Sequence, residues 1–594
     1  MKGFEDLEEE FGREVDYDRR HSGGNVRRKR RNERREQVRR QKRGIAAVIL
    51  VFVLLLIMGG LGFYAIKNEL FDFSKDADMA GILGIEGDEV GLFLDGEYLE
   101  ERGWKSDGEI WLSLDFGRQF LRNLYYDKNE ELLLNTTYRG TESWTKDEAL
   151  RERDGVMFLK LDIIKETPGL SVTEYDTPER LFLNTVEPSE TEISRAARLR
   201  TEPQDKAEVI SKLEEGDMVR LYKRDREWSR VESDGFVGYV KTEALADSGT
   251  GEDAMQLSAG AEEVSVEADE TEDFSFLTYE GKVIMGFHQV TNPDANARIS
   301  DVLAASPGIN VIAPTWFSLS GMSFTSLSDP EYVAAAHEAG VRVWIVADNF
   351  NDPSFFPSTD TENILGWTTR RTALVSELVR SASEVGADGI NIDFEQIPSE
   401  QGEDFAQFIR ELSLESHRAG LVLSVDNYVP RVYSEHYRRD VQAEFADYVV
   451  IMSYDENISE IGPNASIDFV EEGITATIQD VPKEHVINAL PFYTRIWQQK
   501  GAETMNTAAG MNEARNFVSE RGGSFTWSDA NGCNYAEFES GGAKYYVWLE
   551  DDASLETKLK VMDVQGIAGA GFWKLGMEDS GAWDVISRYA AGTL

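Results

Sequence analysis

The chain has 594 residues and a formal net charge of -47 at pH 7, from 61 Lys and Arg against 108 Asp and Glu. This length indicates several domains, and a field this negative argues against nucleic acid as a partner. The single cysteine, Cys533, excludes an internal disulfide and a cysteine-rich metal centre. Because the six histidines show no ligand spacing, we do not expect a zinc enzyme or another metal site. We also expect no cofactor.

The N-terminal segment indicates a membrane anchor. Residues 1–43 end in the basic stretch Arg27–Arg43, and an uncharged apolar run follows over residues 44–66. This run is long enough to cross a bilayer of ~30 Å as one helix. The positive-inside rule then places residues 1–43 in the cytoplasm and everything after Lys67 outside the cell. The alternative is a cleaved signal peptide, but the basic region is long for one and no clear A-x-A site follows.

Two small β-rich modules are predicted next. Residues 68–186 place alternating apolar residues between Gly and Asp turns, as in EIWLSLDF and ELLLNTTY, which is typical of short strands. The order of the predicted elements in residues 68–186 resembles that of the small N-terminal repeats of copper amine oxidases. We interpret this module as a structural stalk. Residues 187–246 contain about five short strands and resemble bacterial SH3-like domains. Trp228, Tyr222 and Tyr239 are candidates to stack on a ligand there, and a core position for Trp228 is the favoured alternative.

Residues 247–275 have the composition of a linker. They are rich in acidic residues and in Ser, Gly, Ala and Thr, and they contain no Lys or Arg. Such a segment buries too little apolar surface to order itself, and its charges repel one another. We expect it to separate the small modules from a C-terminal domain.

The C-terminal domain, residues 277–594, has the pattern of an α/β fold. Helical patterns such as Glu331–Ala339 and Arg371–Glu384 lie between apolar, β-rich runs. There are eight such runs: Lys282–Phe287, Asn310–Ala313, Arg342–Val346, Gly389–Phe394, Leu421–Val425, Tyr448–Met452, Val486–Leu490 and Gly569–Phe572. Eight β/α units over this length predict a (β/α)₈ TIM barrel, whose chemistry lies at the C-terminal ends of the strands.

The fourth predicted strand ends in the polar sequence DGINIDFE. Because side chains of a strand alternate between its faces, Asn391, Asp393 and Glu395 share one face and the apolar residues between them share the other. We expect the apolar face to pack on helices and the polar face to point into the barrel. Burying two carboxyls and an amide in that interior costs free energy unless the groups are hydrogen-bonded or take part in binding or catalysis. The position at the strand end favours an acid/base site over a buried structural network.

DGINIDFE resembles the D-x-x-D-x-D-x-E signature of glycoside hydrolase family 18, the chitinase family. Met452-Ser-Tyr454-Asp455 resembles the family's M-x-Y-D, and Trp573 matches the Trp that forms the floor of the sugar subsite. The segments PTWFSL, VWIVADNF, GPNAS and LPFYTRIW resemble the bacterial branch that cleaves N-acetylglucosamine polymers of the cell wall and spore cortex. The resemblance covers roughly residues 277–592.

The resemblance implies substrate-assisted, retaining catalysis, in which the substrate's own 2-acetamido oxygen attacks the anomeric carbon. It implies that Glu395 protonates the leaving oxygen, that Asp393 orients the acetamido nitrogen, and that Tyr454 donates to the acetamido oxygen. We expect Asp393 to raise the pKa of Glu395, since two close carboxyls resist double ionisation. The predicted substrate-binding residues are Asp388, Asn391, Asp455, Trp573, Tyr493, Arg495, Trp497 and Trp316, with packing as the alternative for each aromatic residue.

Asn391 departs from the signature, which has Asp at this position. An Asp could share a proton with Asp393, whereas Asn cannot. We therefore expect simpler ionisation of Asp393 and an active enzyme with an altered pH profile. Asn391→Asp is expected to shift the pH optimum, and an unchanged profile would contradict this reasoning.

The leading hypothesis is a single-pass cell-membrane glycosidase with an extracellular catalytic domain. Its substrate would be an N-acetylglucosamine polymer with β-1,4 linkages, and both peptidoglycan and chitin fit the residues. The alternative is a non-catalytic carbohydrate-binding or scaffold protein of the envelope. Loss of Glu395 would have favoured that alternative, but the residue is present.

Overall fold

The computed structural model describes residues 50–61, 74–246, 275–349 and 359–594. The chain forms two compact units, one with Met1–Ile82 and Glu190–Met255 and the other with Leu83–Ser189 and Gln256–Leu594. The predicted tail, residues 1–43, and nearly all of the predicted linker lie outside the described residues.

The predicted membrane span lies only partly within the described residues. Residues 50–61 are helical, and their side chains are exposed. Among the residues that the structure describes, no helix is both long enough and apolar enough to cross a membrane.

The SH3-like segment of the first unit forms a six-stranded sheet in the order β11-β14-β15-β16-β12-β13. The strands are β11 Ser189–Glu192, β12 Ala197–Arg200, β13 Val209–Leu213, β14 Met218–Arg224, β15 Trp228–Ser233 and β16 Phe236–Lys241. Trp228 is only 9% exposed, and the Lys241 ammonium lies 4.4 Å from its ring centroid. The structure therefore places Trp228 in a buried position, as the favoured alternative expected.

The β-rich module of the second unit contains two sheets. The larger has the order β7-β8-β3-β2-β1-β10-β9, and the smaller has the order β4-β5-β6. Helix α2 Met79–Leu83 precedes this module and lies in the first unit except for its last residue. The elements of the module are β1 Glu89–Leu94, β2 Glu97–Ser106, β3 Glu109–Ser113, α3 Leu114–Gly117, β4 Leu124–Asp127, β5 Leu132–Thr137, β6 Gly140–Thr145, α4 Lys146–Ala149, β7 Leu150–Arg153, β8 Val156–Lys160, α5 Leu161–Ile164, β9 Ser171–Asp176 and β10 Glu179–Asn184. Alternating apolar side chains such as Val90, Leu92 and Leu112 form its core.

Eight parallel strands close into a barrel, because β17 pairs with both β18 and β30. They are β17 Val283–His288, β18 Val311–Ser320, β20 Arg342–Asp348, β21 Gly389–Asp393, β22 Val422–Tyr428, β23 Tyr448–Met452, β24 Val486–Pro491 and β30 Gly569–Trp573. Each strand overlaps one of the eight predicted runs, so the (β/α)₈ prediction is confirmed. One short strand, β19 Ser323–Ser326, extends β18 as an antiparallel hairpin.

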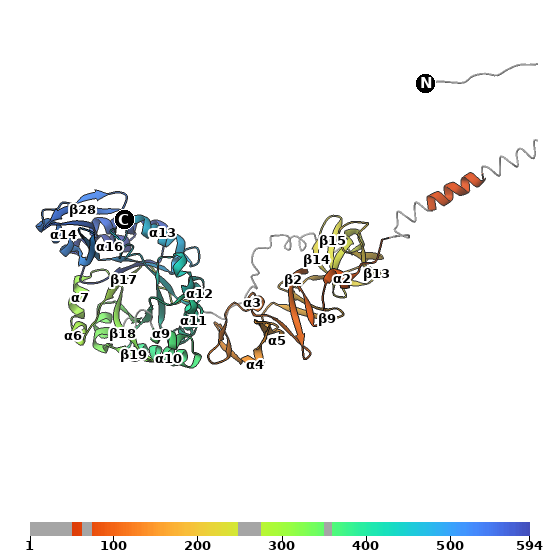
Figure 1. Cartoon of the computed structure of the whole chain (residues 1–594), viewed down its shortest axis with the longest axis horizontal. Coiled ribbons are helices and arrows are strands. Elements are labelled where there is room, and N and C mark those ends of the chain that lie inside the picture. The colour runs from red at the N-terminus through yellow and green to blue at the C-terminus, as the bar shows by residue number, and fades with distance from the viewer. Residues whose placement is uncertain (1–49, 62–73, 247–274, 350–358) are drawn as a thin grey trace, which may run out of the picture. The chain divides into compact units, whose positions relative to one another are not determined.

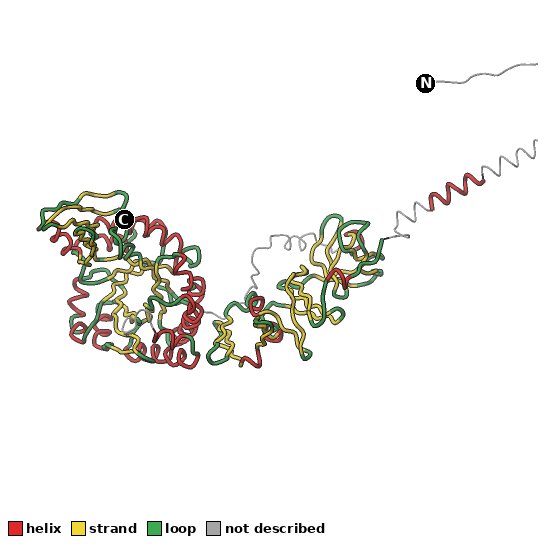
Figure 2. Tube along the Cα trace, viewed as in Figure 1, coloured by secondary structure: helices red, strands yellow, loops and turns green. Residues whose placement is uncertain are grey.

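Helices surround the strands (Figures 1 and 2). They are α6 Pro293–Asn296, α7 Ile299–Ala305, α8 Pro330–Glu338, α9 Thr359–Leu365, α10 Thr368–Val385, α11 Gly402–Arg418, α12 Arg439–Phe445, α13 Ile467–Thr477, α15 Asp552–Gln565 and α16 Ser580–Ala590. An outer core between strands and helices contains Ile390, Ile392 and Phe394. Since alternate residues point the opposite way, Asn391 and Asp393 face the barrel interior, as predicted.

A five-stranded antiparallel sheet is inserted between β24 and α15, in the order β26-β25-β29-β28-β27. It consists of β25 Tyr493–Lys500, β26 Glu503–Gly510, β27 Thr526–Ser528, β28 Cys533–Ser540 and β29 Ala543–Leu549, with α14 Met511–Glu520. The sequence analysis did not predict this sheet. Strand β26 is mostly exposed and carries no continuous apolar alternation, so hydrophobic periodicity gives little signal there.

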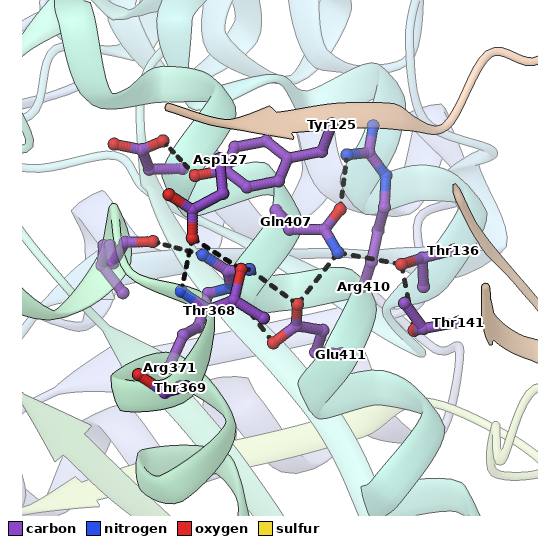
Figure 3. Close-up of polar contacts among 12 residues, drawn as sticks. Tyr125, Asp127, Thr136, Thr141, Thr368, Thr369, Arg371, Gln407, Arg410 and Glu411 are labelled. Carbon is purple, nitrogen blue, oxygen red and sulfur yellow. Dashed lines mark hydrogen bonds and ion pairs between the residues drawn. The ribbon is translucent and has the colours of Figure 1, made fainter. Parts of the chain in front are cut away.

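The three-stranded sheet of the β-rich module contacts the flank of the barrel (Figure 3). Helix α10 begins without a side-chain cap of its own, and Asp127 at the end of β4 supplies one. The Asp127 carboxylate accepts hydrogen bonds from the Thr368 backbone N–H and hydroxyl, both at 2.7 Å. A carboxylate at this position satisfies an unpaired amide and interacts favourably with the helix dipole.

A buried polar cluster continues this contact between α10 and α11 (Figure 3). Arg371 is fully buried and pairs with Glu411 through two nitrogens, at 3.1 and 2.9 Å. Its guanidinium lies 4.9 Å from the Tyr125 ring centroid. Gln407 donates to both Glu411 and Thr136. Residues from β4 and β5 thus complete the environment of a charge pair on the barrel.

Candidate active site

The acidic residues of DGINIDFE lie at the C-terminal end of the fourth barrel strand. Asp393 is the last residue of β21, and Glu395 follows two positions later. Asn391 and Asp393 are buried, and Glu395 is half-buried. The barrel fold therefore presents these side chains at the face where active sites of (β/α)₈ proteins lie.

Two neighbouring strands hold Glu395 in place. Asn349, directly after β20, accepts from the Glu395 backbone N–H at 3.0 Å and donates to its carbonyl oxygen at 2.9 Å. Tyr428, the last residue of β22, donates its hydroxyl to the Glu395 carboxylate at 2.7 Å. These contacts fix both the backbone and the carboxyl group of Glu395.

The pKa of Glu395 is raised above its usual value, which suits a general acid. Burial is the largest cause, donation from Tyr428 lowers the pKa, and the charges of Asp455 and Asp348 raise it further. Asp393 and Glu395 do repel one another, since the charge of Glu395 contributes to the raised pKa of Asp393, but burial is the larger cause for both groups. The raised pKa of Glu395 therefore follows mainly from its enclosure.

Asn391 does not leave Asp393 without an ionisable neighbour, contrary to the expectation. Asp426 on β22 accepts from the Asn391 side-chain amide at 2.8 Å. Burial raises the pKa of Asp393 well above its usual value, and the charge of Asp426 is the next contribution. The second carboxyl comes from the adjacent strand because the parallel register places Asp426 beside β21.

A second group of predicted residues gathers after β23 and along β25. The Tyr454 and Tyr493 rings meet edge-on, with centroids 6.3 Å apart. The Tyr493 hydroxyl donates to the Asp455 carboxylate, and the Arg495 guanidinium lies 2.6 Å from it. Trp573, at the end of β30, is half-buried, and its ring centroid lies 5.5 Å from that of Phe287. Tyr454 and Trp573 both pack against the inner core of the barrel.

Three predicted substrate-binding residues do not join these groups. Trp316 is buried in the outer core and donates its indole N–H to Asn296. Trp497 is buried as well and donates to the Gly462 carbonyl. Asp388 precedes β21 at the opposite end of the strand, where it accepts from the Val343 backbone N–H and contacts His337. These contacts assign all three to packing or structural bonding.

Three residues of this site were not predicted from the sequence: Asn349, Asp426 and Tyr428. The fifth predicted strand carries a usable signal, because Ser424, Asp426 and Tyr428 occupy alternate positions on one face. Asn349 gives no such signal, since a single amide after a strand is common in loops.

Replacing Tyr428 by Phe is expected to move the basic limb of the kcat/KM profile to higher pH by about one unit. The lost hydroxyl stabilised the Glu395 carboxylate, so its removal raises the pKa of Glu395 and keeps the acid protonated further into the alkaline range. A pH–rate series on an N-acetylglucosamine oligomer measures this. Tyr433→Phe, at an exposed position a few residues later, is the matched control. A basic limb that stays in place or moves to lower pH would contradict the role of Tyr428 in stabilising the Glu395 carboxylate.

Glu395 is half-buried, Asp393 is buried, and half-buried Trp573 lies at the end of the eighth strand. Residues 261–578 match the family described as glycosyl hydrolases family 18, and residues 194–247 match the bacterial SH3 domain. The protein is a glycoside hydrolase. Because the match covers more than half of the chain, it belongs to family 18 of the glycosyl hydrolases.

Several known proteins and solved structures are similar to this chain. An uncharacterised glycosylase, YvbX of Bacillus subtilis, is 23% identical over 265 residues, which is 43% of this chain and 76% of that protein. A cortical fragment-lytic enzyme of Bacillus anthracis is 26% identical over 322 residues, covering 50% of this chain and 71% of the relative. A chitinase crystal structure from Chromobacterium violaceum shares 21% identity, with 52% of this chain and 99% of the other covered, at a TM-score of 0.48.

Proposed function

We propose that this protein hydrolyses β-1,4 linkages next to N-acetylglucosamine by substrate-assisted catalysis with retention of configuration. The observation that carries the proposal is the Glu395 carboxyl, which is held by Tyr428 at the end of β21 and has a raised pKa. A carboxyl group with a raised pKa is suited to protonate a leaving glycosidic oxygen.

The neighbouring residues take complementary roles in this proposal. Asp393 Oδ1 is buried and has no hydrogen-bond partner within the described part of the chain, so it is free to accept the N–H of a 2-acetamido group. That contact aims the acetamido oxygen at the anomeric carbon and stabilises the positive charge of the oxazolinium ion. Tyr454 donates to the acetamido oxygen, and Trp573 offers an apolar surface to the sugar ring.

Peptidoglycan is the substrate that we propose. The similarity to a cortical fragment-lytic enzyme favours it, as does the bacterial SH3 domain joined to the catalytic domain in one chain. Mass spectrometry of purified peptidoglycan digested with the full chain tests this. The expected products carry N-acetylglucosamine at the new reducing end. Digestion of chitin oligomers without release of such products would contradict the peptidoglycan assignment.

We also propose that residues 44–66 anchor the protein in the cell membrane with the catalytic domain outside. The uncharged run and the basic stretch before it support this topology. The full chain is expected to stay with membranes after a carbonate wash, whereas a chain lacking residues 1–67 is expected in the soluble fraction. Protease added to intact cells should degrade the catalytic domain. Recovery of the full chain in the wash, or protection from the protease, would contradict the proposal.

A further inference from the structure

Three carboxyl side chains form a row across neighbouring strands of the barrel. The parallel register pairs Asp348 of β20 with Asp393 of β21. The register of β21 and β22 reaches Ile392 opposite Val425, and one further step brings Asp426 beside Asp393. Their exposed fractions are 5% for Asp348, 5% for Asp393 and 3% for Asp426. Since paired residues lie ~4.8 Å apart across strands, Asp393 has a carboxyl neighbour on each side.

Asn391 holds the Asp426 side chain in position. Its amide nitrogen donates to Asp426 Oδ1 at 2.8 Å and to Ser424 Oγ at 3.0 Å. The first of these bonds engages one oxygen of the Asp426 carboxyl, Oδ1. Asp393 Oδ1 is buried and has no hydrogen-bond partner among the described residues. Two ionised carboxyls at this distance repel each other. A proton bound between Asp393 and Asp426 would remove this repulsion and give a buried acceptor a hydrogen-bond donor.

The electrostatics of the row favour retention of a proton. Burial raises the pKa of Asp426 to about 8, with donation from Asn391 opposing and the charge of Glu395 adding to the rise. Burial and then the charges of Asp426, Glu395 and Asp348 raise the pKa of Asp393. Burial raises the pKa of Tyr454, and the charges of both carboxyls raise it further. Within the described part of the chain, no Lys, Arg or His contributes to either shift.

We propose that Asp426 is the acid partner of Asp393, so that the two carboxyls share one proton and Asp426 holds it while ionised Asp393 accepts the acetamido N–H. This inference rests on the proposed function. As the acetamido oxygen bonds to the anomeric carbon and Glu395 gives its proton to the leaving oxygen, the Asp393 carboxylate balances the oxazolinium charge. The shared proton stays within the pair. Asn391 is then a positioning residue, which aims Asp426 at Asp393.

Asp426→Asn in the full chain tests the shared proton through the acidic limb of the kcat/KM profile. The active form needs ionised Asp393, and the neutral carboxyl of Asp426 stabilises that charge. Loss of the shared proton is expected to raise the pKa of Asp393 and move the acidic limb to higher pH by about one unit. An acidic limb that moves to lower pH would mean that Asp426 acts only as a charge that repels Asp393. An acidic limb that does not move would mean that the two carboxyls are not coupled. Either result overturns the proposal.

Asn391→Asp combined with Asp426→Asn rebuilds the pair on one strand. This double variant is expected to return the acidic limb to within about 0.3 units of the wild-type position. A limb that stays shifted would contradict proton sharing and favour a merely structural role for Asp426. Asp115→Asn is the matched control, because it makes the same chemical change at an exposed position far in sequence from the carboxyl row.

A titration of the wild-type chain, with aspartate labelled by ¹³C at the carboxyl, needs neither turnover nor a folded variant. If Asp393 and Asp426 share a proton, the carboxyl signals of two buried aspartates are expected to shift in two separate titration steps. Each signal should then respond to both steps. Independent single steps would overturn the proposal. If the wild-type chain hydrolyses no N-acetylglucosamine polymer, the proposed function fails, and this titration still decides whether the carboxyl pair shares a proton.

Discussion

Glu395→Gln is expected to reduce kcat on an unactivated N-acetylglucosamine oligomer by about 10³-fold. Gln keeps the shape of the side chain and its contact with Tyr428 but has no proton to give to the leaving oxygen. Steady-state kinetics of the full-length variant measure the loss. Glu400→Gln removes the same charge at an exposed position a few residues later and is expected to retain wild-type rates.

The choice of leaving group sharpens this test. A dinitrophenyl glycoside leaves without protonation, so Glu395→Gln is expected to slow its cleavage far less than that of the oligomer. Equal losses on both substrates would indicate that the substitution disturbs binding instead of acid catalysis. Equal rates of the variant and the wild type on the oligomer would favour the non-catalytic carbohydrate-binding alternative.

Arg371→Met is expected to lower the free energy of unfolding of the catalytic unit by about 3–5 kcal/mol. The substitution leaves Glu411 largely buried beside Gln407 without its countercharge, and it removes donation to the Leu365 carbonyl. Chemical denaturation followed by circular dichroism measures the loss. Arg380→Met on the same helix breaks only an exposed pair and is expected to cost less than ~1 kcal/mol.

The double variant Arg371→Met with Glu411→Met is expected to recover most of this stability, because two apolar side chains replace the whole pair. A loss below ~1 kcal/mol for Arg371→Met alone would contradict the importance of the cluster. No recovery in the double variant would place the effect in the packing against Tyr125.

The strands and the positions of the candidate carboxyls could be predicted because their signals are local. Alternation along DGINIDFE places Asn391 and Asp393 inside and Ile390 and Ile392 outside, and the structure follows it. The same alternation argues against a substrate-binding role for Trp316. Trp316 is an even number of residues after Ile312, which lies in the outer core. Asp388 begins the signature, but an extended strand carries it on the order of 20 Å from Glu395 at ~3.3 Å per residue.

The contacts that depend on distant segments could not be predicted in this way. Asp127 caps a helix that begins at Thr368, and Asp426 meets Asn391 only through the register of β21 and β22. Neither pairing leaves a periodic pattern in the chain. The signature places a carboxyl partner for Asp393 at position 391 of the same strand, where this chain has Asn, whereas Asp426 lies on the neighbouring strand.

The configuration of the first product tests the central claim most directly. Proton NMR during the first minutes of hydrolysis, before mutarotation, reports which anomer the enzyme releases. Attack by the substrate's acetamido oxygen followed by water predicts the β-anomer first, with the α-anomer rising only later. Initial release of the α-anomer would mean a single displacement by water and would contradict the roles given to Asp393 and Glu395.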